Sequence, residues 1–327
     1  MDPITQGALG AVCAQAVLFK KDKHAWIVGG LAGMAADLDI VIHSSSDPLL
    51  FFIYHRQFTH SLLFIPLGAL FVSLVLMLFK RFRKHFLLTF LAAFIGYGTH
   101  GLLDAFTNYG TVLYWPFSNT RVSWDLISII DPWFTFPLIL GLVWTIVNAN
   151  VKGVLYGLIF AILVLLFNAY QHHRGLQLMQ TFVKSNHLSL QRLRLFPKMM
   201  SSTHWRGIGL SRDRFFAFDL ALPVLGKSNM AIVANYPLAR AEDIPEYIRT
   251  SPSLLRDWMV FNWFCDGYVI RANPLPLLIA DGRFLLDDDP AVSLWGIQFY
   301  PNQLHVKRLN FIELEHQNDD SHTRYWR

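Results

Sequence analysis

The sequence predicts an α-helical membrane bundle of about four to six helices, followed by a β-rich or α+β soluble domain. Hydrophobic residues make up 53% of the 327-residue chain and charged residues only 16%, whereas a typical soluble domain is about 25% charged. Nearly all of the long apolar runs lie in residues 1–170. The rest of the chain is mixed and aromatic-rich, and it is long enough to bury a core of its own.

Three parts follow from this distribution: a membrane helical domain at 1–170, an amphipathic connector at 171–196 and a soluble β-rich domain at 197–327. The last part contains short β-branched or aromatic runs, such as GYVIRA and LWGIQFY, separated by Gly, Pro, Asn and Asp. That pattern is typical of strands. Residues 239–264 instead have the pattern of a helix that Pro252 breaks.

Six apolar segments are candidate membrane helices. A helix needs about 20 apolar residues to cross roughly 30 Å of hydrocarbon. Two segments reach that length, two more do so with polar ends, and two are shorter. The short ones are rich in glycine and alanine, which favours a helical hairpin packed closely against the other helices. In that order, the segments are Ser61–Phe79 and Val151–Tyr170, Phe86–Asp104 and Ile129–Asn148, and Ile4–Phe19 and Ala25–Ile42.

Basic residues indicate how these helices are oriented. Alternating the six segments puts the basic connections on one side, which the positive-inside rule makes cytoplasmic. We therefore expect a multi-pass protein in contact with membrane lipid, with its soluble domain on the outer side. The net charge is +5, but the basic residues cluster beside apolar segments, so no nucleic-acid partner is expected. The basic connections contain Lys20, Lys21, Lys23, Lys80, Arg81, Arg83, Lys84 and Lys152.

Histidines and aspartates gather at the helix ends opposite the basic connections. His100 and Asp104 are four residues apart, so both project from one face of a helix. His55 and His60 lie before and at the start of the helix that follows them, where Thr59 is a candidate N-cap. Two imidazoles from a loop and a helix start can approach one ion.

Two further aspartates lie at the same helix ends. Asp37 and Asp39 are two residues apart and can face one site only if their helix has already ended. Gln6 lies at the outer start of the first segment, and Asp125 and Asp131 fall in or beside the last outer connection. Imidazole and carboxylate groups are common ligands of zinc and related ions. The set is therefore typical of a one- or two-metal hydrolytic centre, and the alternative is a polar rim without metal.

These residues occur in motifs that resemble the YdjM-like family of inner-membrane, metal-dependent hydrolases. The matching elements are MDPITQGALG at the N-terminus, DLD near residue 38, HRQFTHS at 55–61, HGLLDAF at 100–106 and PFSNTRVSWDLISIIDPWFT at 116–135. The pairing of HRxxTHS with a later HxxxD is the most specific of them. The resemblance implies a bacterial inner-membrane protein, distantly related to zinc-dependent phospholipase C and P1-type nucleases, which cleave phosphate esters with clustered metal ions.

The same resemblance implies a divalent metal cofactor, zinc in the first place and manganese as the alternative. One departure concerns the first ligand, because many members have Thr-His where this chain has Thr5-Gln6. A glutamine carbonyl can bind a metal, but more weakly than imidazole does. The implied ligands are Asp37, Asp39, His55, His60, His100 and Asp104, with Gln6 at the departing position.

Three functions are compatible with the sequence. The first is a metal-dependent hydrolase acting on a phosphoester or lipid-linked substrate at the outer membrane face, with Asp39 or Asp131 as general base. The second is a non-catalytic sensor or scaffold whose polar cluster is structural or binds metal without turnover. The third is a transporter, which is disfavoured because the ionisable residues gather at one face instead of stepping through the bilayer.

Overall fold

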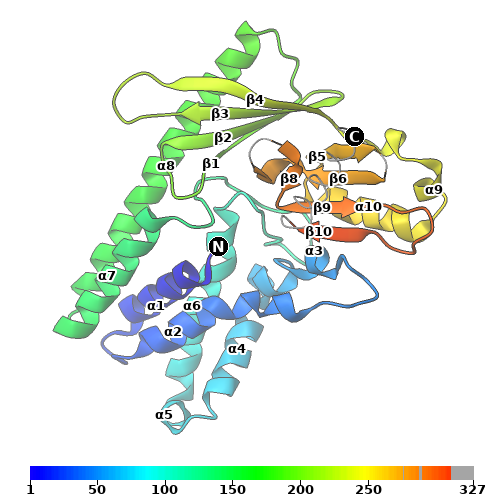
Figure 1. The fold of residues 1–327 in the computed structure, drawn as a ribbon. Coiled ribbons are helices and arrows are strands. Elements are labelled where there is room, and N and C mark those ends of the chain that lie inside the picture. The colour runs from blue at the N-terminus through cyan, green and yellow to red at the C-terminus, as the bar shows by residue number, and fades with distance from the viewer. Residues whose placement is uncertain (275, 287–288, 311–327) are drawn as a thin grey trace, which may run out of the picture.

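The structure, a computed structural model, describes residues 1–274, 276–286 and 289–310 and has two halves (Figure 1). The N-terminal half consists of helices, and the C-terminal half contains two four-stranded antiparallel sheets with a helix beside one of them. The long helix α8 (Lys152–Ser185) runs along both halves. The prediction of a helical region followed by a β-rich domain is confirmed.

Sequence signals explain where the helices of the first half begin. The Asp2 side chain accepts a hydrogen bond from the Thr5 N–H at the start of α1, and Asp131 does the same for Trp133 at the start of α7. A proline follows each aspartate at the first helical position, where no N–H is needed. The elements are α1 (Pro3–Leu18), α2 (Ala25–Ala35), η1 (Ala36–Val41), α3 (Leu50–Tyr54), η2 (Phe58–His60), η3 (Leu62–Phe64), α4 (Ile65–Leu76), α5 (Lys80–Arg83), α6 (Phe86–Ala105) and α7 (Pro132–Asn148).

Fewer helices can cross a membrane than we predicted. In the described residues, α6 and α8 are long and apolar enough, and Leu50–His60 with Leu62–Leu76 makes a third span if this pair, bent by 59°, counts as one. Helices α1, α2 and α7 have 16, 11 and 17 residues, so at about 1.5 Å per residue they fall short of roughly 30 Å. The prediction of about four to six spanning helices was therefore too high. The orientation relies on α1, α2 and α7 crossing, and it stays a prediction.

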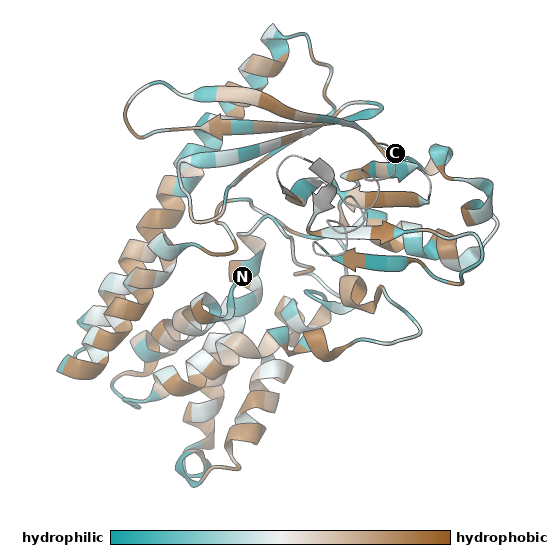
Figure 2. Ribbon diagram, in the orientation of Figure 1, coloured by the Kyte–Doolittle hydropathy of each residue, from teal (hydrophilic) through white to brown (hydrophobic). Residues whose placement is uncertain are grey.

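The helices of the N-terminal half are nevertheless built largely from hydrophobic residues (Figure 2), and many of these are exposed. Phe71 on α4, Leu140 on α7 and Leu166 on α8 are examples, each about 60% exposed or more. Soluble monomers rarely expose a continuous apolar surface of this extent. Contact with lipid accounts for it, which supports a membrane protein.

Glycines bring three helices of this half into close contact. A Cβ atom at Gly96 of α6 would overlap the carbonyl oxygen of Gly29 in α2, and one at Gly29 would lie 2.5 Å from the carbonyl oxygen of Gly10 in α1. Only small residues let helix backbones approach so closely, and van der Waals packing of this kind holds helices together in lipid. The predicted hairpin of α1 and α2 is confirmed.

The C-terminal half is built from antiparallel strands. One sheet has the strand order β1–β2–β3–β4, the other has β10–β9–β6–β5, and β7 pairs with β8. The predicted helix at 239–264 is divided into α9 and α10, and Pro252 is the first residue of α10. The elements are β1 (Arg192–Pro197), β2 (His204–Leu210), β3 (Arg214–Ala221), β4 (Asn229–Pro237), η4 (Ala241–Asp243), α9 (Glu246–Arg249), α10 (Pro252–Phe264), β5 (Val269–Pro274), β6 (Leu277–Asp281), η5 (Gly282–Phe284), β7 (Leu285–Leu286), β8 (Asp289–Ser293), β9 (Trp295–Gln298) and β10 (Lys307–Asn310).

The range 171–196, which we predict as an amphipathic connector, holds the end of α8 and most of β1. Helix α8 continues without a break into this range. Its residues Met179 and Val183 pack against Trp205 and Phe218 of the first sheet. One helix therefore links the two halves and also contributes to the core of the second.

The two halves also share a hydrophobic core. Leu49 and Phe52, at the start of and within α3, are fully buried in the cluster that contains Phe264 of α10, and the Phe52 and Phe264 ring centroids are 4.2 Å apart. Arg194 of β1 donates from Nε and Nη2 to the two carboxylate oxygens of Asp125, at 2.9 and 2.7 Å. The packing of Phe52 therefore fixes the position of α3 against the C-terminal half, and the pair of Arg194 and Asp125 is a second link between the halves.

We expect Gly96→Ala to destabilise the protein by about 1–3 kcal/mol, because its Cβ forces α6 away from α2. The thermal unfolding midpoint of the purified protein in detergent measures this effect. Gly98→Ala is the matched control on the same helix, since its Cβ would lie 3.7 Å from the nearest atom, in Ile65. Equal midpoints for the two variants would contradict the proposed close packing.

Candidate metal centre

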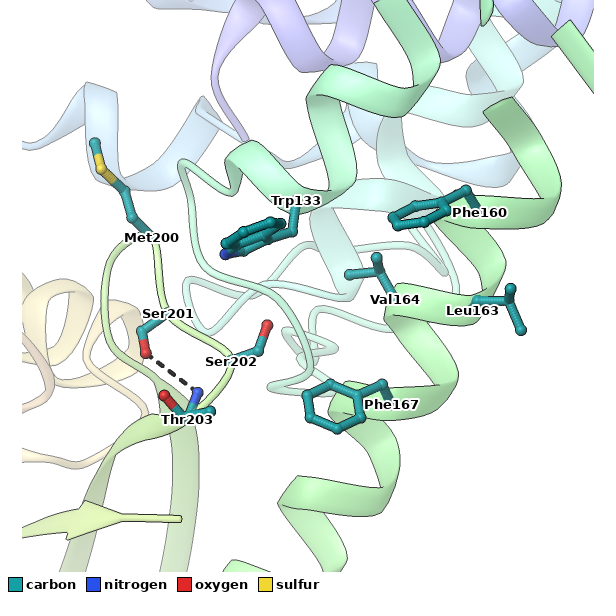
Figure 3. Close-up of a pocket in the computed structure, with 9 residues that line it drawn as sticks. All are labelled: Trp133, Phe160, Leu163, Val164, Phe167, Met200, Ser201, Ser202 and Thr203. Atoms are coloured by element: carbon teal, nitrogen blue, oxygen red, sulfur yellow. Dashed lines mark hydrogen bonds between the residues drawn. The ribbon is translucent and has the colours of Figure 1, made fainter. Parts of the chain in front are cut away.

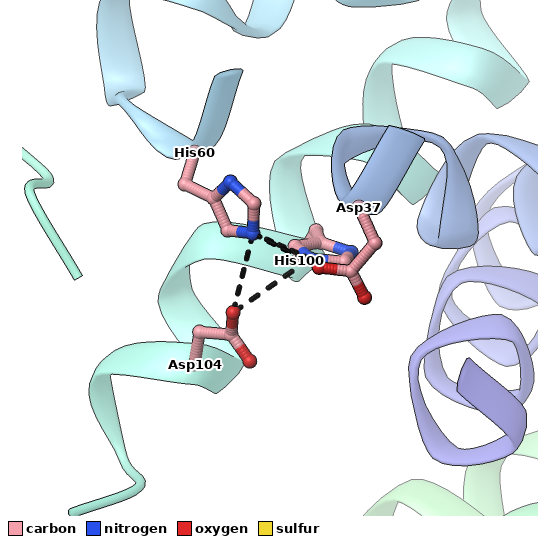
Figure 4. A group of neighbouring side chains, drawn as sticks. All are labelled: Asp37, His60, His100 and Asp104. Carbon is pink, nitrogen blue, oxygen red and sulfur yellow. Dashed lines mark hydrogen bonds and ion pairs between the residues drawn. The ribbon is translucent and has the colours of Figure 1, made fainter. Parts of the chain in front are cut away.

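Four of the predicted ligands converge in the helical half: Asp37, His60, His100 and Asp104 (Figure 4). One ligand atom of each lies within 4.8 Å of those of the other three. The Nε2 atoms of the two histidines are 3.0 Å apart. Asp104 Oδ2 lies 3.3 Å from the Nε2 of His60 and 3.7 Å from that of His100. Asp37 Oδ1 lies 3.3 Å from the Nε2 of His60 and 3.4 Å from that of His100. Two imidazoles and two carboxylates thus surround one point.

Hydrogen bonds determine which nitrogen of each imidazole carries the proton. His100 Nδ1 lies 2.5 Å from the carbonyl oxygen of Gly33, which can only accept, so the neutral ring has its lone pair on Nε2. His60 Nδ1 lies 3.2 Å from Asp39 Oδ2, so the neutral His60 ring also has its lone pair on Nε2. Metal-binding histidines generally donate their other N–H to a carbonyl or carboxylate in this way.

The resulting arrangement fits a divalent cation. Two nitrogen lone pairs and two carboxylate oxygens face one another, and such groups repel unless positive charge lies between them. Asp104 Oδ2 is buried and has no hydrogen-bond partner in the described part of the chain, although Arg56 Nε and His60 Nε2 each lie 3.3 Å from it as ion-pair partners. Two imidazole and two carboxylate ligands are a donor set that zinc and manganese both accept.

Asp39 holds the segment 55–60 in place. Its Oδ1 lies 2.7 Å from His55 Nδ1, and its Oδ2 accepts hydrogen bonds from the Arg56 backbone N–H at 3.1 Å and the Thr59 hydroxyl at 2.6 Å. Burial acts to raise the pKa of the Asp39 carboxyl, but hydrogen bonds from His55 and His60 outweigh it and hold the pKa below its ordinary value. The prediction of Thr59 as a helix N-cap was wrong, because its hydroxyl serves Asp39 instead.

Asp37 also belongs to a second group, with Asp39 and His55. The side chains of Asp37 and His55 are 22% and 14% exposed, whereas those of His60, His100 and Asp104 are fully buried. Solvent therefore reaches the centre at Asp37 and His55. A carboxylate shared by two groups is also the arrangement that a two-metal site requires.

Interruptions in the helices allow these side chains to meet. Helix α2 ends at Ala35 and the 3₁₀ turn η1 follows. The α-helix has therefore ended before Asp37, as it must if Asp37 and Asp39 are to face one site. Arg56, directly after α3, has φ of 65°, a left-handed conformation that costs roughly 1–2 kcal/mol for a residue with a side chain. This reversal of the chain brings the segment 57–60 back toward η1. Such strain is common at functional sites.

Gln6 faces the centre with its amide N–H groups. Its Nε2 donates to Asp104 Oδ1 at 2.9 Å, and the amino group of Met1 pairs with the same oxygen. Arg56 Nε lies 3.3 Å from the other oxygen of Asp104. In this arrangement Gln6 orients a candidate ligand through its N–H groups, and its buried carbonyl oxygen has no hydrogen-bond partner in the described residues.

Asp131 and Asp125 lie outside both groups of candidate ligands in the described residues. Asp131 Oδ1 accepts hydrogen bonds from the N–H groups of Trp133 and Phe134, at 3.0 and 3.3 Å. Burial raises the pKa of the Asp131 carboxyl in spite of those two bonds. Asp125 is paired with Arg194. Asp131 therefore acts as the cap of α7, and Asp125 links the two halves.

Sequence reasoning missed two contributors, Arg56 and Gly33. Arg56 lies between two predicted ligands in HRQFTHS, and a charged residue in the middle of such a motif was a usable signal. Gly33 acts through its backbone carbonyl, and only the packing of α2 against α6 reveals this.

The fold and the site together define a membrane protein with a buried group of histidines and aspartates that can hold a metal ion. Residues 1–175, more than half of the chain, match the family described as YdjM inner membrane protein, and the chain belongs to that family. The uncharacterized protein YfhP of Bacillus subtilis (strain 168) is 32% identical over 110 residues, which are 33% of this chain and 33% of YfhP. The chain thus spans about a third of that relative's length. No solved structure matches the chain.

Asp39→Asn should weaken zinc binding by about 10- to 100-fold, because an amide cannot accept from His55, Thr59 and His60 as a carboxylate does. Calorimetric titration of metal-free protein in detergent with zinc measures the affinity. Asp131→Asn is the control, since it changes another buried aspartate outside both groups, and it should retain the wild-type affinity. Equal affinities of the Asp39→Asn variant and the wild type would contradict this role of Asp39.

Proposed function

We propose that the protein is a membrane-bound, metal-dependent hydrolase that acts on a phosphoester or lipid-linked substrate at the outer membrane face. The observation that carries the proposal is the pair of imidazole Nε2 atoms, 3.0 Å apart, with both Nδ1 protons directed elsewhere and two carboxylates beside them. Two imidazole nitrogens and two carboxylate oxygens held around one point form an arrangement that a bound cation would stabilise.

The residues of the centre divide into those that would hold metal and those that orient them, and Asp37 would have a second role described below. His60, His100, Asp37 and Asp104 would hold the metal, and Asp37, Asp39 and His55 offer room for a second ion. A divalent ion bound there would supply Lewis acidity and make water a better nucleophile near neutral pH. Asp39 and the carbonyl of Gly33 orient the two imidazoles, and Gln6 orients Asp104.

The contacts favour Asp37 as the group that receives a proton during hydrolysis. Our two initial candidates for the base were Asp39 and Asp131. Both oxygens of Asp39 are occupied by groups of the segment 55–60, and Asp131 caps α7. Asp37 has the most exposed side chain of the carboxylates in the two groups, so water and substrate can reach it.

The location of the centre supports a substrate at the membrane surface. His100 and Asp104 lie in the last two turns of α6, and the chain that follows reaches the C-terminal half at Asp125 and Arg194. The centre is thus at the end of an apolar helix and next to the β-rich half, where lipid headgroups would lie if α6 spans the membrane. A phosphoester or lipid-linked compound would present its polar group there.

His60→Ala and His100→Ala should each abolish metal-dependent phosphodiesterase activity and remove bound zinc. Hydrolysis of a chromogenic phosphodiester by purified protein, with metal content from elemental analysis of the same samples, measures both. A chelator should remove the activity, and zinc or manganese should restore it. His173→Ala changes an exposed histidine on α8 and should behave as wild type.

Two results would contradict the proposal in different ways. Activity that persists in both variants would exclude this centre as the catalytic site. Bound metal without turnover on any phosphoester would favour the alternative, a non-catalytic sensor or scaffold that uses the metal structurally.

Reporter fusions test the proposed orientation. A reporter inserted after Lys84 should be active in the cytoplasm, because the basic connections are retained there. A reporter at the C-terminus should be active on the outer side, which requires α7 to cross the membrane together with α6 and α8. Two reporters active on the same side would contradict an outer-face site.

A further inference from the structure

A hollow separate from the metal centre lies where α7, α8 and the loop between β1 and β2 meet (Figure 3). Its volume is about 480 Å³, within the range of sites for small ligands. The helices contribute apolar walls, chiefly Trp133, Phe160, Leu163 and Phe167, and the loop contributes the polar side chains of Ser201, Ser202 and Thr203. The hollow is therefore apolar along one side and polar at one end.

A second hollow lies further along the same two helices, on the other side of Phe160. That hollow has a volume of about 370 Å³ and shares Phe160 with the first. It exists because α7 and α8 touch through glycines: a Cβ at Gly157 would lie 2.8 Å from the carbonyl oxygen of Pro137. Leu140 and Tyr156 line this groove, where the glycines leave no side chain to fill it.

The length of the two hollows matches one leaflet of a bilayer. Trp133 lines the first and Trp144 the second, so at about 1.5 Å per residue the groove follows α7 for roughly 16 Å. Half of a hydrocarbon core is about 15 Å thick. Phe160 and Leu163 are about half exposed on α8, a helix long and apolar enough to span the membrane, so lipid is the medium around the groove.

The polar end lies beside the part of α8 where its apolar run gives way to the polar residues 171–174. Gln171 Nε2 donates to the carbonyl oxygen of Leu222 at 2.7 Å and lies 3.4 Å from that of Ser202, which fixes the loop at this level of the helix. Met200 N donates to the carbonyl oxygen of Ile130 at 3.1 Å, which fixes it to the start of α7. The loop is thus held rigidly over the apolar groove, and the Ser202 hydroxyl points toward the hollow (Figure 3).

We infer that this groove binds one phospholipid from the leaflet next to the C-terminal half. One acyl chain lies along α7 and α8 past Phe160, and the phosphodiester accepts a hydrogen bond from the Ser202 hydroxyl, since those of Ser201 and Thr203 contact His204 instead. This site is independent of the proposed hydrolase activity. A lipid held here also links the start of α7 to the first sheet, since both contribute to its walls.

Photolabelling tests the acyl-chain part of the inference. The full-length protein is reconstituted in phosphatidylethanolamine vesicles that contain a small fraction of phosphatidylethanolamine with a diazirine on one acyl chain. After illumination, adducts are located by peptide mass spectrometry. We expect adducts to concentrate at Phe160 and Leu163 compared with Leu166, which is slightly more exposed than either but lies outside both hollows. Even labelling of these positions would overturn the inference, because it would indicate ordinary surrounding lipid.

A matched pair of variants tests occupancy. Leu163→Trp fills the groove and should reduce labelling at Phe160 about tenfold, the factor expected when roughly two methylene groups lose their burial. Leu166→Trp adds the same ring on the same helix and should leave labelling unchanged. Wild-type labelling in Leu163→Trp would overturn the inference, as would a change in oligomeric state without a change in labelling, which would indicate a protein partner in the groove.

The headgroup part has its own test, which does not require Leu163→Trp to fold. Ser202→Val removes one hydroxyl at the polar end and should lower the amount of phospholipid retained in native mass spectra. A diazirine fatty alcohol, which has no phosphodiester, should label the groove several-fold less than the phospholipid. Equal labelling by the two probes, or full lipid retention in Ser202→Val, would overturn the assignment of a phospholipid headgroup to this loop.

Discussion

The carboxylate of Asp39 is the contact on which the candidate centre depends. It is buried and accepts hydrogen bonds from a segment that holds two histidines, a strained arginine and a threonine. Without it, His60 would lose the partner that keeps its Nδ1 protonated, and the facing lone pairs would no longer be specified. A buried carboxylate is stable only when it is paired, so the site and the local fold stabilise each other.

The C-terminal half contributes to the same site from a distance. Helix α3 ends just before His55 and is held by its burial of Phe52 among aromatic residues of the second half. The ring of Phe51 stacks on that of His55, with centroids 4.8 Å apart, and lies 5.5 Å from the Trp295 ring. The second half therefore acts as a rigid support for one edge of the centre, which is a role that its strand pattern alone does not suggest.

Local patterns predicted the class of the fold but overestimated the number of membrane spans. Apolar composition identifies α6 and α8 as spans because each is continuous and long. It also suggests a single helix at Ser61–Phe79, yet the chain there forms η3 and then α4, which ends at Leu76. Hydropathy measures how well a segment tolerates lipid. It does not show whether tertiary packing interrupts the helix, as the contact of Leu62 N–H with the Leu113 carbonyl does here.

The sequence by itself determined the residue types of the centre, since HRQFTHS and HGLLD contain three histidines and an aspartate at spacings that ligands require. Tertiary structure alone decided how they meet. Asp37 and His100 are brought together because α2 packs on α6 through glycines. The backbone carbonyl of Gly33 places the N–H of the His100 ring at Nδ1. Backbone groups carry no residue-specific signal, so a contact between elements far apart in the chain is visible only once the chain has folded.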